Sequence, residues 1–224
     1  MTILSKNIKI TTIILLFLSL SLTSCFDIIQ DLTVKENGSG KFALTVNLSK
    51  SKSQLEKILA QDYLYGFNIP STRKIEEKLR TLKTEFTKLK GISNVQIQKD
   101  FNHYVFKLTF DFQHVNNINQ AQIELAKLDP KIGQPITYSY SAKEFNCSYS
   151  KDLLKEADNQ LIQYKLADLS SADLITIFRF DKQIKSCSNS TCKISKNGKT
   201  TFNKVTAPAF IGNTINHSVK ITFN

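Results

Sequence analysis

The chain contains no tryptophan and has only seven glycines, four prolines and four cysteines among its 224 residues. This scarcity of glycine and proline, with no low-complexity linker or internal repeat, argues against several domains joined by flexible segments. The chain also lacks an apolar run of about 20 residues, which a transmembrane helix needs. Its longest apolar stretch, Ile10–Leu20, is too short to span a bilayer. We therefore expect a single domain without a membrane-spanning helix.

The first residues have the composition of a secretory signal peptide. No acidic residue precedes Asp27, while Lys6 and Lys9 give the start of the chain a positive charge and Ile10–Leu20 comes next as the apolar segment. A basic start before an apolar segment of about 7–15 residues is typical of a signal peptide. Residues 1–24 are therefore predicted to direct export and to be removed.

The apolar segment leads to the tetrapeptide Leu22-Thr23-Ser24-Cys25. This tetrapeptide resembles the lipobox of bacterial lipoproteins. The resemblance implies that the Cys25 thiol receives a diacylglycerol, that the chain is cut just before Cys25 and that the new amino group is often acylated as well. Each buried methylene contributes about 0.8 kcal/mol, so two or three acyl chains would hold residues 25–224 durably on a membrane. The alternative is a plain secreted protein cut after Ser21, with Cys25 in a disulfide.

The residue after Cys25 bears on the membrane that such a lipoprotein would reach. In Gram-negative lipoproteins, an aspartate directly after the lipidated cysteine favours retention in the inner membrane. Phe26 stands there in this chain, and Asp27 comes one position later. The resemblance therefore implies delivery to the outer membrane, facing the periplasm.

The sequence is strongly basic, with a formal net charge of +11 and a pI of about 9.4. In a cytoplasmic protein this balance would suggest a nucleic-acid partner, but the export signal argues against nucleic acid. Most of the excess is lysine, and two explanations stay open. The lysines reflect the codon usage of an AT-rich genome, or they face anionic head groups beside the anchor, where each contributes about 1 kcal/mol.

Three cysteines remain once Cys25 is assigned to lipid, so at most one internal disulfide can form. Cys187 and Cys192 bracket the sequence SNST, which we expect to reverse the chain between two strands. Residues opposed on paired strands have Cα atoms about 4.5–5.5 Å apart, within the range of a disulfide. A Cys187–Cys192 bridge is therefore possible by geometry, while a bridge to Cys147 and three free thiols are the alternatives.

Apolar periodicity predicts an α+β fold. Strict alternation with intervening turns indicates hairpins over 26–48, 94–112 and 192–202, and further strands over 135–141, 144–150, 173–186 and 217–224. Helices are expected over 51–66, 71–91 and 117–128, with partly helical character over 151–166. Hairpins with intervening helices favour a mainly antiparallel sheet of hairpins with helices packed on one face.

The helix over 71–91 has two possible roles. Its apolar residues recur at helical spacing, as Ile75, Leu79, Leu82, Phe86 and Leu89, while its other face is rich in lysine. Such a helix can lie on lipid, but a core-facing stripe packed on the sheet is the prediction made here.

The sequence contains no recognisable catalytic motif. His103, His114 and His217 stand in no HExxH array, and the GxSxG, Walker and GxGxxG patterns are missing. Glu76 and Glu77 are adjacent, so on a helix they point about 100° apart, which does not suit paired acid–base chemistry. The CxxxxC spacing of Cys187 and Cys192 is not that of a zinc site. No cofactor, metal or enzymatic activity is therefore predicted.

A wider resemblance covers most of the exported chain. The hairpin with its Asn37-Gly38-Ser39-Gly40 turn directly after Cys25, the helical pair, and the closing FRF…KSCS…ISKNGKT segment resemble a group of uncharacterised bacterial lipoproteins. The resemblance implies a lipid-anchored envelope protein and brings no known activity. We expect a non-enzymatic binding or assembly factor whose partners are membrane lipid, through Cys25, and an envelope protein. The alternative is a hydrolase-like enzyme with a dispersed site.

Overall fold

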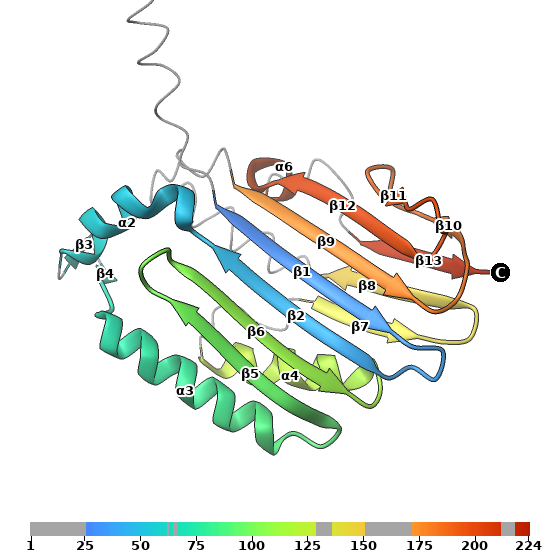
Figure 1. Ribbon diagram of the computed structural model, residues 1–224, viewed down its shortest axis with the longest axis horizontal. Helices are drawn as coiled ribbons and strands as arrows, with labels where there is room; N and C mark the ends of the chain where they lie inside the picture. Colours follow the sequence, from blue (N-terminus) through green and yellow to red (C-terminus); the bar gives the residue numbers. More distant parts are fainter. Residues whose placement is uncertain (1–25, 62, 65–66, 129–135, 151–171, 212–217) are drawn as a thin grey trace, which may run out of the picture.

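The computed structural model describes residues 26–61, 63–64, 67–128, 136–150, 172–211 and 218–224. The described fold is built on two β-sheets that face each other (Figure 1). The larger sheet has seven strands in the order β11-β12-β9-β1-β2-β6-β5. Its strands are β1 (Asp27–Val34), β2 (Gly40–Asn47), β5 (Ile92–Asp100), β6 (Val105–Phe112), β9 (Asp173–Phe180), β11 (Lys193–Ile194) and β12 (Thr200–Thr206).

The predicted first hairpin forms the middle of this sheet. β1 and β2 pair in antiparallel register along their whole length, from Asp27 opposite Asn47 to Val34 opposite Gly40. The turn is held by the Asn37 side chain, whose Oδ1 accepts a hydrogen bond from the Ser39 N–H at 3.0 Å. At Gly40 the two strands come so close that an added Cβ would lie 1.8 Å from a backbone oxygen, which explains why glycine ends the turn.

A parallel pairing joins the first strand to one that follows it by more than a hundred residues. β1 pairs with β9 in parallel, residue for residue, with Gln30 opposite Thr176. All other strand pairs in the two sheets are antiparallel. The described chain therefore has its N-terminal strand at the centre of the larger sheet.

The second sheet has four strands in the order β10-β13-β8-β7. They are β7 (Ile136–Tyr140), β8 (Glu144–Tyr149), β10 (Ile184–Cys187) and β13 (Val219–Phe223). The sequence predicted one strand over 173–186, and this prediction was wrong: the chain leaves the larger sheet after Phe180 and enters the smaller one at Ile184. The buried residues Phe178, Phe180 and Ile184 all stand at even-numbered positions, so alternation alone did not reveal the change of sheet.

Two helices share the covering layer with the second sheet. α3 (Thr72–Lys88) begins after Ser71, whose hydroxyl accepts a hydrogen bond from the Lys74 N–H at 3.4 Å. Its Leu82 and Phe86 are buried, and the Phe86 ring lies 5.7 Å from that of Phe110 on β6. α4 (Asn116–Leu128) lies behind the larger sheet in Figure 1. The α+β class and the packing of the stripe on α3 against the sheet are thus confirmed.

Shorter elements complete the described fold. They are η1 (Ser49–Ser51), α2 (Lys52–Leu59), β3 (Tyr63–Leu64), β4 (Phe67–Asn68) and α6 (Ala207–Ile211). The helix predicted over 51–66 is therefore too long, because the chain leaves helical geometry at Ala60 and continues as a small hairpin. The helical character predicted over 151–166 lies outside the described residues. Within the described part of the chain, no helix has the length and apolarity needed to cross a membrane.

Aromatic rings fill the space between the sheets. Phe42 and Phe110 of the larger sheet stack with ring centroids 5.0 Å apart, and Phe178 lies 5.0 Å from Phe145 of the smaller sheet. The ring centroids of Phe180 in the larger sheet and Phe223 in the smaller sheet lie 4.9 Å apart. Aromatic pairs add about 0.5–1.5 kcal/mol beyond the area they bury, so these contacts fasten one sheet to the other.

Candidate functional site

The predicted lipidation site, Cys25, lies outside the described residues, and the larger sheet begins almost directly after it. Strand pairing starts at Asp27, and the Phe26 carbonyl already accepts a hydrogen bond from the Asp173 N–H at 2.9 Å. We call this end of the larger sheet the proximal end; it holds the start of β1, the end of β2 and the start of β9. α2 and α6 lie at the same end (Figure 1). The described part of the sheet thus begins at Phe26, the residue after Cys25.

Charged residues at the proximal end are largely paired. Lys50 lies 3.5 Å from Asp27, and Lys204 lies 2.7 Å from Asp173. In the β5–β6 turn, the His103 ring nitrogen lies 2.7 Å from Asp100, and this hydrogen bond lowers the pKa of the Asp100 carboxyl. The lysines named here therefore lie among carboxylates rather than in a single positive patch.

The structure joins Cys187 and Cys192 in a disulfide, with Cα atoms 6.5 Å apart. The two cysteines do not face each other across a strand pair, contrary to the geometry we expected. Cys187 belongs to β10 of the smaller sheet and lies opposite Ile221, while Cys192 precedes β11 of the larger sheet. The bridge therefore closes a loop that passes from one sheet to the other.

Among the described cysteines, Cys147 alone is unbridged. Its side chain is completely buried on β8, and burial raises the pKa of its thiol to about 12. A thiol with this pKa stays protonated near neutral pH, and the thiolate is the form that attacks electrophiles and binds metals. Cys147 therefore serves as a small apolar core residue with a weak hydrogen-bonding group.

The other residues considered for chemistry are dispersed. His103 lies at the proximal end, His114 comes after β6 at the opposite end, and His217 lies outside the described residues. Glu76 pairs with Lys99, and Glu77 pairs with Arg73, so the two glutamates point to different partners. Within the described ranges, no group of three His, Cys, Asp or Glu side chains could hold a metal ion.

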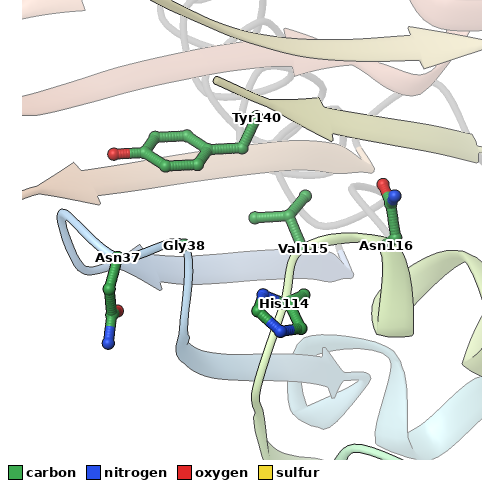
Figure 2. A pocket seen from close by; sticks show the side chains of 6 residues that line it. All are labelled: Asn37, Gly38, His114, Val115, Asn116 and Tyr140. Atoms are coloured by element: carbon green, nitrogen blue, oxygen red, sulfur yellow. The ribbon is translucent and has the colours of Figure 1, made fainter. Parts of the chain in front are cut away.

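A small pocket lies at the distal end of the larger sheet, where β1 turns into β2. It has a volume of about 220 Å³ and is lined by Asn37, Gly38, His114, Val115, Asn116 and Tyr140. Figure 2 shows the Tyr140 ring and the His114 imidazole on different walls of this pocket. The Tyr140 hydroxyl donates to the Glu36 carbonyl at 3.2 Å, and burial, followed by Glu36 and Asp181, raises its pKa. The volume is below the roughly 300–1,000 Å³ of ordinary ligand pockets, and its groups form no nucleophile–base pair.

The face of the larger sheet that points away from the second sheet is here called the outer face. No described element covers it, and Figure 1 views the sheet from this side. Ile29, Ile175, Ile177 and Phe202 lie next to one another on it, since β1 pairs with β9 and β9 pairs with β12 in this register. Phe202 is 40% exposed and the three isoleucines are half-buried.

Ion pairs flank these four apolar residues. Arg179 donates two hydrogen bonds to Asp31, at 3.1 Å and 2.9 Å, and Lys204 reaches Asp173 at 2.7 Å. Along β1, Leu32 and Val34 point into the core, while Ile29 lies on the opposite face. The sequence signal for this placement was present in consecutive apolar pairs such as Ile28-Ile29, which put one residue on each side of a strand.

Comparisons with known proteins leave the chain without an assigned family. The chain matches no protein-family model and no curated protein. Among solved structures, it is similar to the NMR structure of the folded domain of LppM from Mycobacterium tuberculosis, with 8% sequence identity, a TM-score of 0.42 and 89% of each chain covered. A likeness of this size carries no residue role or activity to the present chain.

Proposed function

We propose that this protein is a bacterial lipoprotein of the cell envelope, anchored by acylated Cys25, that acts as a non-enzymatic binding or assembly factor. The lipobox-like sequence Leu22–Cys25 supports the anchor, because it comes directly after a signal-peptide pattern. Phe26 in place of an aspartate supports delivery to the outer membrane, facing the periplasm.

The anchor would hold the folded domain against the bilayer. Phe26 is the single residue between Cys25 and β1, and it already takes part in the sheet hydrogen bonding. A chain of one residue spans at most about 3.6 Å, so the proximal end would lie at the membrane surface. Acyl chains would supply most of the attachment, since Lys50 and Lys204 at this end lie beside carboxylates.

The outer face is the observation that carries the binding role. Its four adjacent apolar side chains are Ile29, Ile175, Ile177 and Phe202, and the charged pairs Arg179–Asp31 and Lys204–Asp173 border them. An apolar centre with a polar rim is the usual composition of a protein–protein interface. The rim argues against burial in lipid, because desolvating ion pairs in hydrocarbon is costly. The partner is therefore proposed to be an envelope protein.

The anchor is tested by the mass of the mature N-terminal peptide, taken from membrane-fractionated protein. We expect a peptide that begins at Cys25 and carries two or three acyl chains. An unmodified peptide that begins at Leu22 would contradict the anchor and support a plain secreted protein. The Cys25→Ser variant should leave the membrane fraction, while the matched Cys147→Ser variant should remain in it.

The binding role is tested by site-specific photo-crosslinking in intact cells. A benzophenone amino acid at Ile177 should cross-link reproducibly to one envelope protein, and the same probe at Ser148, on the exposed side of the smaller sheet, should not. Ile177→Lys should abolish capture by a probe at Phe202. Equal products from Ile177 and Ser148, or cross-links to lipid alone, would contradict the role proposed for the outer face.

A further inference from the structure

A groove lies at one end of the smaller sheet, where the β7–β8 turn, β10 and the end of β13 meet. It has a volume of about 620 Å³, within the roughly 300–1,000 Å³ of ordinary ligand pockets. Each of the three segments contributes polar or charged residues to its lining, and these include Lys143, Glu144, Lys185, Ser186 and Thr222. Unlike the smaller pocket beside Tyr140, this groove has room for a small organic molecule.

A β-bulge in β10 brings Lys185 to the groove. Ile184 lies opposite Phe223 on β13 and Ser186 lies opposite Thr222, so Lys185 is one residue more than the partner strand can pair with. A regular strand turns successive side chains to opposite faces, whereas Lys185 and Ser186 are consecutive and both exposed. Bulges are over-represented next to active sites, where they re-aim a side chain. Here the bulge places an ammonium group beside a hydroxyl.

The second lysine of the groove, Lys143, stands in a turn that hydrogen bonds fix from two sides. The Ser141 hydroxyl accepts hydrogen bonds from the N–H groups of Lys143 and Glu144, at 3.3 Å and 3.2 Å. The Lys143 carbonyl accepts one from the Phe223 N–H at 3.0 Å. The backbone that carries Lys143 is therefore held in place beside β13, on the opposite side of that strand from β10.

The groove has an excess of positive charge. The acidic side chain that lines it, Glu144, accepts a hydrogen bond from Lys220 at 2.7 Å, and this bond, followed by one from Asn146, lowers the pKa of the Glu144 carboxyl. Its negative charge is thus already paired. Among the residues that the structure describes, neither Lys143 nor Lys185 forms an ion pair with a carboxylate. An anion that enters the groove would therefore meet two ammonium groups that have no other counter-charge there.

Hydroxyl groups add a further donor to the groove. The Ser186 and Thr222 hydroxyls lie 2.7 Å apart and share one hydrogen bond, so the proton of one of them remains for a ligand. Two ammonium groups and a hydroxyl complement an ionised oxygen acceptor, which forms hydrogen bonds about twice as strong as a neutral one. We propose that the groove is a binding site for a small organic anion whose carboxylate or phosphate group is held by Lys143 and Lys185. The site is independent of the proposed anchor and of the outer face, because the smaller sheet builds it.

The test is an NMR titration of the isotope-labelled, full-length protein in a non-ionic detergent at low salt. The probes are acetate, methyl phosphate and acetamide, which has the shape of acetate without its charge. Acetate or methyl phosphate should shift the backbone N–H signals of Lys143, Lys185 and Ser186 to saturation, and acetamide should not. The anion with the lower dissociation constant identifies the group that the site recognises.

Paired variants separate this site from a general attraction of anions to lysine. The Lys143→Gln/Lys185→Gln variant should raise the dissociation constant about tenfold or more, since a hydrogen bond to a charged group contributes about 1.5–3 kcal/mol. The matched control is Lys78→Gln/Lys83→Gln, which removes the same charge from exposed positions on α3 and should leave the constant unchanged.

Three outcomes would overturn the proposal. Equal shifts with acetamide and acetate would show that charge is not recognised. Equal weakening in the two double variants would show a general attraction to the basic surface. No saturable shift at the groove with either anion would show that the groove binds neither group. Circular dichroism checks that all variants are folded, as expected for changes at exposed side chains.

Discussion

The interior of this protein consists of two unlike halves that the same strands supply. In the distal half, Leu32, Phe178 and Phe42 form one inward-facing row and meet the rings of the second sheet. Two residues closer to the proximal end, the corresponding row contains Gln30 and Thr176 on the same strands. Two residues further along the same strands, the inward-facing side chains thus change from packed aromatic rings to unpaired polar groups.

The difference indicates a division of labour. The distal half has the ring contacts that hold the sheets together, such as Phe145 with Phe178 and Phe180 with Phe223. The proximal half has the buried polar side chains of Gln30 and Thr176, whose Nε2 and Oγ1 atoms have no hydrogen-bond partner among the described residues, and the buried thiol of Cys147. An unpaired buried polar group lowers the stability of the folded state, so other contacts must offset its cost. The aromatic contacts of the distal half supply that stability.

The strongest test of this division removes one ring from the distal half. Phe178 is 1% exposed and touches Phe145, so Phe178→Ala should lower the free energy of unfolding by about 3–5 kcal/mol. Urea unfolding at constant slope measures this change. Phe202→Ala, on the outer face and 40% exposed, is the control and should cost far less. Equal losses in the two variants would show that the aromatic half does not carry the stability.

The disulfide tests how firmly the two sheets are joined beside the polar half. Thr191, inside the Cys187–Cys192 loop, has its hydroxyl 2.5 Å from Asn203, which lies opposite Thr176. The loop is short, so the double change Cys187→Ser/Cys192→Ser should cost about 2 kcal/mol in the chain-entropy model. The melting temperature with and without reductant measures the effect. Reductant should lower it in the wild type and leave the double variant unchanged.

The fall of stability at alkaline pH should report the buried thiol of Cys147. The Cys147 pKa is raised from 9.0 to about 12 in the folded state. Between these values the folded protein binds the proton and the unfolded chain releases it. This contribution is therefore complete below about pH 9 and is lost as pH rises toward 12, by about 1.4 kcal/mol for each pH unit. Tyr138 and Tyr149, whose pKa values are also raised by burial, act in the same direction.

The matched variants separate this contribution from general alkaline unfolding. In the wild type, the midpoint of urea unfolding should fall between pH 9 and pH 11, and in Cys147→Ala it should fall less. In Phe145→Leu the midpoint should be lower than in the wild type by the same amount at every pH in this range. A slope that is the same in both variants would contradict the assignment to Cys147.

The smallest expected effect concerns the outer face, which belongs to neither half. Arg179 and Asp31 form a two-fold hydrogen-bonded ion pair with side chains 45% and 33% exposed. An exposed pair contributes about 0–1 kcal/mol, so Asp31→Asn should change the free energy of unfolding by less than about 1 kcal/mol. Chemical unfolding measures it, with Lys57→Gln on α2 as the control for a simple charge change. A loss as large as that of Phe178→Ala would assign a structural role to the outer face.

The local elements were largely predictable, because each is determined by residues close together in the chain. Alternation predicted the β1–β2 and β5–β6 hairpins, and the turn at Asn197-Gly198 was found where β11 leads to β12. Ser71 and the apolar stripe after it predicted α3. The end of α2 was missed, since the apolar residues Tyr63, Leu64 and Phe67 continued a helical spacing while the chain turned into β3 and β4.

The candidate sites divide in the same way. The proposed anchor at Cys25 depends on a contiguous pattern, so the sequence alone raises it as a hypothesis. The outer face combines residues more than a hundred positions apart, such as Ile29 with Ile175, and the buried polar pair of Gln30 and Thr176 does the same on the inner face. Alternation within each strand puts Gln30 on the same face as Leu32, and Thr176 on the same face as Phe178. It could not predict that Gln30 and Thr176 are neighbours, because that depends on how β1 and β9 pair.

By itself, the sequence determined the export pattern, the hairpins, the helices and the face of each strand that turns inward, because periodicity and turn chemistry act over a few residues. The tertiary structure alone decided that Phe180 and Ile184 belong to different sheets, that β1 and β9 pair in parallel, and that Cys187 and Cys192 link the two layers. These outcomes depend on which strands pair, and pairing is selected by packing between segments far apart in the chain.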